Sequence, residues 1–181
     1  MRSVRIPNDR VGIIIGHKGE TKRMLSKITG IKIDVDTEGE VMIHDDNAKD
    51  PLMALKLLDV VKAIGRGFSP ERAMKLFDDD DEYLEVIDLK EFVTGRPNQL
   101  SRIRGRIIGH NGKTREIIED LAGVNLSIYG NTVALIGSSV SLPVAKQAIE
   151  MLLNGSEHST VYRYLEVQRP RLRIAEMGFD P

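Results

Sequence analysis

The chain contains no cysteine, which excludes a disulfide framework and thiolate metal sites. It also lacks tryptophan and has only four tyrosines and four phenylalanines, so we expect cores built mainly from Ile, Leu and Val. No stretch approaches the roughly 18 apolar residues of a membrane helix, and residues 1–10 do not resemble a signal peptide. These absences predict a soluble, cytoplasmic protein that does not associate with membranes.

An excess of charge of one sign is also missing, because the net charge is −1. Residues 1–81 contain 14 basic and 15 acidic side chains, and residues 82–181 contain 12 of each. Any electrostatic footprint of a nucleic-acid-binding protein must therefore be local. Between residues 92 and 115 there is no acidic side chain, whereas six are basic: Arg96, Arg102, Arg104, Arg106, Lys113 and Arg115.

An internal repeat indicates the domain organisation. Residues 12–35 align without a gap with residues 105–128, at an offset of 93 positions. Eight of the 24 aligned positions are identical, among them Gly12/Gly105, Gly16/Gly109, His17/His110, Gly19/Gly112, Thr21/Thr114 and Gly30/Gly123. We therefore predict two domains: residues 1–81, which include a connecting helix at 70–77, and residues 82–181, which include a helical tail.

Each copy has the predicted element order β-α-α-β-β-α. The opening strands are expected at Val4–Pro7 and Tyr83–Leu89, each followed by a short apolar helix and a G-x-x-G turn. The next helices carry apolar residues at helical spacing: Met24, Leu25 and Ile28, and Ile117, Ile118 and Leu121. Two alternating strands and a long amphipathic helix complete each copy. Residues 160–169 are expected to be helical, and Pro170 is expected to end or kink this tail.

The two G-x-x-G turns have a composition that suits phosphate binding. Glycine permits a tight turn without Cβ clashes, so that the backbone can approach a phosphate chain closely. Each turn opens onto the N-terminus of a helix, where free N–H groups and the helix dipole attract anions. Lys18 and Lys22 add positive charge to the first turn, and Lys113, Arg115, Arg104 and Arg106 surround the second.

This element order, with G-x-x-G between the first two helices, resembles the type I KH fold. The resemblance implies an α+β protein with two tandem type I KH domains, each a three-stranded sheet with three helices on one face, plus a C-terminal helix. The whole chain is similar to the archaeal and eukaryotic small-subunit pre-rRNA processing factor family, the partner of the Nob endonuclease. The segments that carry this similarity are residues 66–73, 83–89, 104–109 and 132–137. Both G-x-x-G turns are intact, as in archaeal members.

Membership would imply a non-enzymatic adaptor that binds single-stranded RNA near the 3′ end of small-subunit rRNA, in ribosome biogenesis. The implied protein partners are an rRNA-processing endonuclease and a translation initiation factor subunit, with no DNA and no cofactor. Two alternatives stay open: a KH protein of RNA decay or translational control, and a protein-interaction scaffold.

The candidate RNA-binding residues follow from the way in which a KH G-x-x-G loop clamps backbone nucleotides while the bases lie over an aliphatic floor. In the first domain they are Gly12, Ile14, Gly16, His17, Lys18, Gly19, Lys22 and Ile33, with Val35 completing the floor. In the second domain they are Arg104, Arg106, Ile107, Gly109, His110, Asn111, Gly112, Lys113, Arg115 and Leu126. The basic run leads us to expect the second domain to be the dominant RNA site.

Other chemistries are not supported by the sequence. Gly112-Lys113-Thr114 ends like a nucleotide P-loop, but the required first glycine is replaced by Ile107. His17 and His110 have no metal-ligand spacing with His44 or His158, so no metal site is expected. No catalytic constellation has supporting context. The acidic run at 78–81 is interpreted as a solvated linker.

Overall fold

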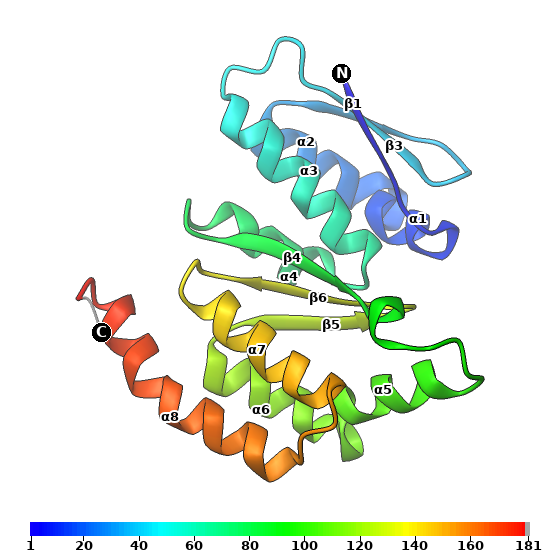
Figure 1. The fold of residues 1–181 in the computed structure, drawn as a ribbon. Coiled ribbons are helices and arrows are strands. Elements are labelled where there is room, and N and C mark those ends of the chain that lie inside the picture. The colour runs from blue at the N-terminus through cyan, green and yellow to red at the C-terminus, as the bar shows by residue number, and fades with distance from the viewer. Residues whose placement is uncertain (180–181) are drawn as a thin grey trace. The chain divides into compact units, whose positions relative to one another are not determined.

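The computed structural model describes residues 1–179, and its contacts divide the chain into two compact units, Met1–Glu82 and Tyr83–Pro181. We call them the first and second modules. Each contains a three-stranded antiparallel sheet, and helices cover one face of that sheet (Figure 1). The predicted fold class, two tandem α+β domains with the order β-α-α-β-β-α, is confirmed.

In the first module the sheet has the strand order β1-β3-β2. Its elements are β1 (Arg2–Arg5), α1 (Asn8–Ile15), η1 (His17–Gly19), α2 (Glu20–Thr29), β2 (Lys32–Val35), β3 (Glu40–His44), α3 (Pro51–Gly65), α4 (Pro70–Ala73) and η2 (Met74–Phe77). The opening strand lies two residues earlier than predicted. Pro7, which has no N–H for a strand ladder, instead takes the N-cap position of α1.

In the second module the sheet has the corresponding order β4-β6-β5. Its elements are β4 (Tyr83–Asp88), η3 (Leu89–Phe92), α5 (Gln99–Ile108), η4 (His110–Gly112), α6 (Lys113–Ala122), β5 (Asn125–Tyr129), β6 (Thr132–Gly137), α7 (Ser141–Leu153) and α8 (His158–Glu176). Helix α8 has no counterpart in the core KH pattern, and it packs against α6 and α7.

Helix α8 continues through Pro170 to Glu176, so of the two predicted effects of Pro170, ending or kinking the tail helix, the first is wrong. Proline removes one backbone hydrogen bond and crowds the preceding turn. Packing outweighs this cost, because Val161 and Leu165 before the proline and Leu172 after it are all buried. Most helical stability in proteins comes from such tertiary contacts rather than from local propensity.

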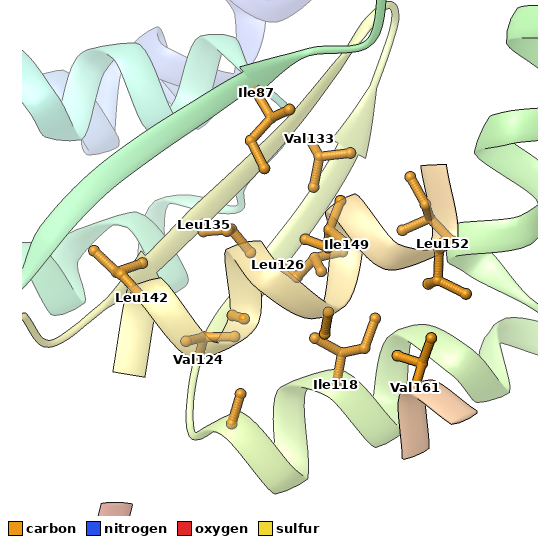
Figure 2. Packing of buried hydrophobic residues seen from close by; sticks show 14 of the residues in the cluster. Ile87, Ile118, Val124, Leu126, Val133, Leu135, Leu142, Ile149, Leu152 and Val161 are labelled. Atoms are coloured by element: carbon orange, nitrogen blue, oxygen red, sulfur yellow. The ribbon is translucent and has the colours of Figure 1, made fainter. Parts of the chain in front are cut away.

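The core of each module lies between the sheet and its helices. In the second module Val133 of the central strand is paired with Ile87 on one side and Ile128 on the other. Figure 2 shows how Val133 and Leu135 point from the sheet toward α6 and α7. In the first module Val41 is the corresponding central residue, between Val4 and Val35.

The apolar residues of α2 do not all face this core. Leu25 is fully buried, but Met24 is 36% exposed and Ile28 is 48% exposed. In α6 the equivalent Ile118 is buried, while Ile117 and Leu121 pack against the core cluster as partly buried residues. Of the three apolar residues predicted at helical spacing in α2, only Leu25 therefore belongs to the core.

The segment between the modules is held by specific contacts. Ser69 caps α4, since its hydroxyl accepts a hydrogen bond of 3.3 Å from the backbone N–H of Arg72. Lys56 is only 8% exposed, and its ammonium group donates to Asp79 O at 2.8 Å and Asp80 Oδ1 at 3.0 Å. The acidic run is thus anchored at Lys56 rather than wholly solvated.

Candidate nucleic-acid interface

The two G-x-x-G turns have the same backbone conformation. The first glycines, Gly16 and Gly109, have φ angles of 76° and 75°. The third positions also lie in the left-handed region, with φ of 51° at Lys18 and 53° at Asn111. Because a non-glycine residue rarely adopts this conformation, its occurrence at the same place in both turns indicates a shared, specialised geometry.

The first glycine of each turn is required by a close approach to the following helix. A Cβ atom added at Gly16 would overlap the side chain of Thr21 and lie 2.7 Å from its backbone nitrogen. At Gly109 the added atom would meet Thr114 in the same way, also 2.7 Å from the backbone nitrogen. The repeated Gly/Thr pair therefore sets how tightly the turn folds back on its helix.

The helices that follow the turns begin without a side-chain cap. Gly19 and Gly112 occupy the N-cap positions of α2 and α6, and no side chain hydrogen-bonds to the first N–H groups of either helix. The first turn of a helix leaves N–H groups without an intrahelical partner, and its dipole favours a negative charge there. Both turns thus present donors suited to a phosphate group.

The glycine one turn before each loop leaves its helix backbone uncovered. A Cβ atom at Gly12 or Gly105 would meet no atom within 4 Å, and both residues are exposed. Neither residue has a positive φ angle. Packing therefore does not demand a glycine at these two places, whereas a ligand that approaches the helix backbone closely would.

Four apolar residues that the sequence predicts to bind RNA have almost no accessible surface, so direct contact with RNA is wrong for them. Each of them is at most 1% exposed and belongs to the core: Ile14, Ile33, Ile107 and Leu126. These four side chains belong to the core and present no accessible surface to an RNA bound at the turns. Val35 is half-buried, as are Ile15 and Ile108, which directly precede the first glycine of each turn. Beside each turn, apolar surface is thus accessible at Ile15 and Ile108, one position later than Ile14 and Ile107.

Asp34 on β2 partly neutralises the basic groups of the first module. Its carboxylate accepts from His44 Nε2 at 2.8 Å and forms ion pairs with Lys32 at 3.3 Å and Lys22 at 3.9 Å. The hydrogen bond with His44, followed by that with Lys32, lowers the pKa of Asp34 below its usual value. The equivalent residue of the second module is Ser127, so no carboxylate lies at that position.

A hollow of about 700 Å³ lies beside the second G-x-x-G turn. Its walls come from α5, the turn, the start of α6 and the start of α8: Arg102, Gly105, Arg106, Gly109, His110, Lys113, Thr114, His158 and Tyr162. Arg106, His110 and Lys113 are three of the candidate residues, and Gly105 is the uncovered glycine. The structure therefore gathers basic side chains of α5 and α6, an exposed helix backbone and two aromatic rings around one space.

Helix α8 is fixed to the other walls of this hollow by hydrogen bonds. The hydroxyls of Thr114 and Tyr162 share a bond of 2.8 Å, and His158 Nε2 donates to the carbonyl oxygen of Arg106 at 2.9 Å. Arg106 in turn donates through Nη2 to the carbonyl of Ser156, just before α8. The C-terminal helix is thus part of the candidate site and fixes the position of its aromatic side chains.

Comparison with known proteins agrees with this geometry. Residues 83–170 match the model of a eukaryotic-type KH domain of type I, and residues 1–49 match the model of a KH domain. The KH domain-containing protein MJ0443 of Methanocaldococcus jannaschii is 47% identical over 95% of this chain and 75% of its own length. The aDim2p of Pyrococcus horikoshii OT3, solved in a complex with a/eIF2α and rRNA, is 48% identical, with a TM-score of 0.86 over 93% of both chains.

The chain belongs to the Dim2/PNO1 family of tandem KH-domain pre-rRNA processing proteins. A eukaryotic member, the pre-rRNA-processing protein PNO1 of Eremothecium gossypii, is 30% identical over 74% of this chain and 50% of its own length. The chain therefore spans about half the length of that relative. The Dim2/PNO1 family consists of RNA-binding proteins without catalytic activity, so the chain is not an enzyme.

The remaining basic candidates lie outside the hollow. Nε of Arg104 is buried and has no hydrogen-bond partner among the described residues, so this guanidinium retains donor capacity. Arg115 forms an ion pair of 3.4 Å with Glu119 one turn further along α6. In the first turn His17 and Lys18 are exposed, and the Lys18 carbonyl accepts from Arg23 at 2.7 Å.

Five residues of the hollow were not among the sequence candidates: Arg102, Gly105, Thr114, His158 and Tyr162. His158 and Tyr162 are four residues apart, and their rings meet edge to face at 6.1 Å. Two rings at helical spacing, at the start of the tail helix, were the available signal. In the described part of the chain no helix is long and apolar enough to span a membrane. Residues 1–179 also contain no cluster of acidic and histidine side chains that could hold a metal ion.

Proposed function

We propose that this chain is a single-stranded-RNA-binding adaptor that engages the 3′ region of small-subunit rRNA through its G-x-x-G turns, chiefly through the second. The observation that carries the proposal is the basic hollow beside Gly109–Gly112, where uncapped helix N–H groups, Lys113 and an uncovered glycine backbone meet. Pre-rRNA processing as the cellular context comes from the family.

Phosphate and base would be recognised by different parts of this site. The N-terminus of α6 and Lys113 suit a phosphate, because they combine directed N–H donors with a positive charge. Tyr162 and His158 suit an unstacked base, because single-stranded RNA is read by stacking on aromatic faces and by hydrogen bonds to base edges. This division favours single strands over duplexes.

The protein partners belong to the same proposal. The Pyrococcus horikoshii relative has been solved with both rRNA and a/eIF2α. We extend this to an initiation factor α subunit as a partner of the present chain, and to an rRNA-processing endonuclease for which the bound RNA would be positioned.

The test is RNA titration of the full chain, followed by fluorescence anisotropy with a labelled oligonucleotide of the rRNA 3′ end. Replacing His110 and Asn111 by Asp keeps both glycines and should weaken binding by at least tenfold. The same replacement at His17 and Lys18 should have a smaller effect. If neither pair changes the affinity while the circular dichroism spectrum stays normal, the turns are not the RNA site.

The salt dependence of binding provides a second readout. Each phosphate contact on a single strand contributes a log–log slope of roughly −0.7. A site built from two short clamps should give a modest slope and a measurable preference among RNA sequences. A steep slope without sequence preference would indicate a generic polyanion binder instead.

A further inference from the structure

In the second module, α8 covers one face of α6. The Thr114 hydroxyl bonds to Tyr162 OH at 2.8 Å. Further along α6, one hollow is lined by residues of both helices: Ile117, Asp120 and Leu121 from α6, with Tyr162, Glu166 and Arg169 from α8. A second hollow continues along the same pair of helices to Gly123 and Glu176. This face of α6 is thus a helix-docking surface with its helix in place.

In the first module the equivalent surface has no helix over it. Helices α2 and α6 have the same length, each begins after a left-handed glycine and each ends at one, with an offset of 93. At the positions of Thr114, Ile117, Asp120 and Leu121 the first module has Thr21, Met24, Lys27 and Ile28. Helix α3 is followed by the short α4 and then by β4, without a counterpart of α8.

The first-module surface is apolar where the second-module surface is covered. Met24 is 36% and Ile28 is 48% exposed, whereas Ile117 and Leu121 are partly buried beside α8. Ile13, the equivalent of Arg106 at the foot of α8, is 37% exposed as well. We call Ile13, Thr21, Met24, Lys27 and Ile28 the α2 face. It keeps the hydroxyl and the apolar anchors of the occupied docking surface.

The charges of the two surfaces are opposite. The α6 side carries Glu116 and Asp120, where the α2 side carries Arg23 and Lys27. Helix α8, which lies over α6, has four arginines and two glutamates within its bounds: Arg163, Arg169, Arg171, Arg173, Glu166 and Glu176. A basic helix therefore covers an acidic one in the second module. A helix that suits the α2 face must carry the reverse charge.

We propose that the α2 face is a docking site for an amphipathic helix of a partner protein, with acidic residues flanking its apolar stripe. Apolar side chains of such a helix at i, i+3 and i+4 would cover Met24 and Ile28, and a carboxylate would pair with Lys27. A second copy of this chain suits the site poorly, because its own α8 is basic and already packed. Single-stranded RNA would leave the apolar side chains of α2 in contact with water. The proposal does not depend on RNA binding by the G-x-x-G turns.

The test uses two synthetic peptides with the sequence of residues 158–176, one natural and one with Arg169→Glu and Arg173→Glu. Each is titrated into the ¹⁵N-labelled full chain by NMR. The acidic peptide should bind at least tenfold more tightly than the natural one, and its chemical-shift changes should centre on residues 21–30. Lys27→Glu should reverse the preference, while Lys49→Glu, the same charge change at an exposed loop position, should leave it unchanged.

Ile28→Asp provides the second variant. A side chain that is 48% exposed can be replaced without disturbing the fold, and the NMR spectrum of the variant will verify that it is folded. It should abolish binding of the acidic peptide while leaving RNA affinity within twofold. Equal binding of both peptides, or shift changes away from α2, would overturn the proposal. It would also fail if a single-stranded RNA oligonucleotide displaced the peptide from Lys27, or if sedimentation showed a dimer of the chain that Ile28→Asp dissociates.

Discussion

The uncovered glycine of α5 permits a test in which stability and RNA binding should change in opposite directions. Gly105 lies inside a helix with ordinary backbone angles, and an added Cβ atom meets nothing within 4 Å. A glycine in a helix interior is destabilising by about 0.5–1 kcal/mol relative to alanine. Gly105→Ala should therefore raise the free energy of unfolding by about this amount, which corresponds to a Tm increase of roughly 2–8 °C for the second module.

A large side chain at position 105 should lower the affinity for RNA. Leucine retains good helix propensity, so Gly105→Leu should fold normally while its side chain projects into the hollow. Blocking one nucleotide is expected to cost about 1–3 kcal/mol, which is a roughly 5- to 150-fold loss of affinity. Thermal unfolding by circular dichroism and anisotropy with a labelled single-stranded RNA measure the two effects on the same sample.

Two control variants separate the roles of the glycines. Ser101→Leu places the same side chain on the exposed surface of α5, one turn away from Gly105, and should change affinity less than twofold. Gly109→Ala should destabilise the module by at least about 1–2 kcal/mol, because its φ is 75° and the new Cβ meets Thr114. Wild-type RNA affinity of Gly105→Leu, or destabilisation by Gly105→Ala, would refute the idea that this glycine is kept open for a ligand.

Three further predictions concern the electrostatics and the tail. In a chain whose second G-x-x-G turn has been inactivated, Asp34→Asn should raise RNA affinity by about 1.5- to 5-fold, because it releases Lys22 and Lys32 from their ion pairs. Anisotropy titrations measure the effect. An equal gain from Glu38→Gln would show that the change in net charge alone explains it. In the otherwise natural chain, Lys113→Glu should weaken RNA binding more than Lys18→Glu, and the reverse order would make the first turn dominant. Pro170→Ala should raise the free energy of unfolding of the second module by about 1–3 kcal/mol. An unchanged Tm would show that the packing around α8 already compensates for the missing hydrogen bond.

The fold could be predicted because the internal repeat presents the same sequence pattern twice. A single G-x-x-G means little, but Gly16 and Gly109 stand at the same junction of two helical patterns, and both turn out to lie against a threonine. Local chemistry also accounts for the cap at Ser69 and the helix ends at Gly30 and Gly123. In each of these cases the deciding interaction lies within a few residues along the chain.

The errors arose where distant segments decide the outcome. Ile14 and Ile107 are predicted to contact RNA, yet both are fully buried, because α1 packs against α2 and α3 and α5 packs against α6 and α7. The extent of α8 past Pro170 depends on Leu172 packing into the module, which no local signal reveals. Tyr162 was missed for the same reason, since it reaches Thr114 across 48 residues.

The two modules keep one backbone and differ in the residues around it, which lets each copy specialise without refolding. After the second glycine of the turn the first module has Glu20, where the second has Lys113, and on the following strand Asp34 stands where the second has Ser127. Glu20 is exposed and Asp34 is only partly covered, so these carboxylates affect the local potential more than the packing. Each carboxylate opposes phosphate binding at the first turn, and neither has a counterpart at the second. Under the proposed function, the same backbone would therefore favour RNA more strongly in the second module, while the uncovered α2 would leave the first module available for protein contacts.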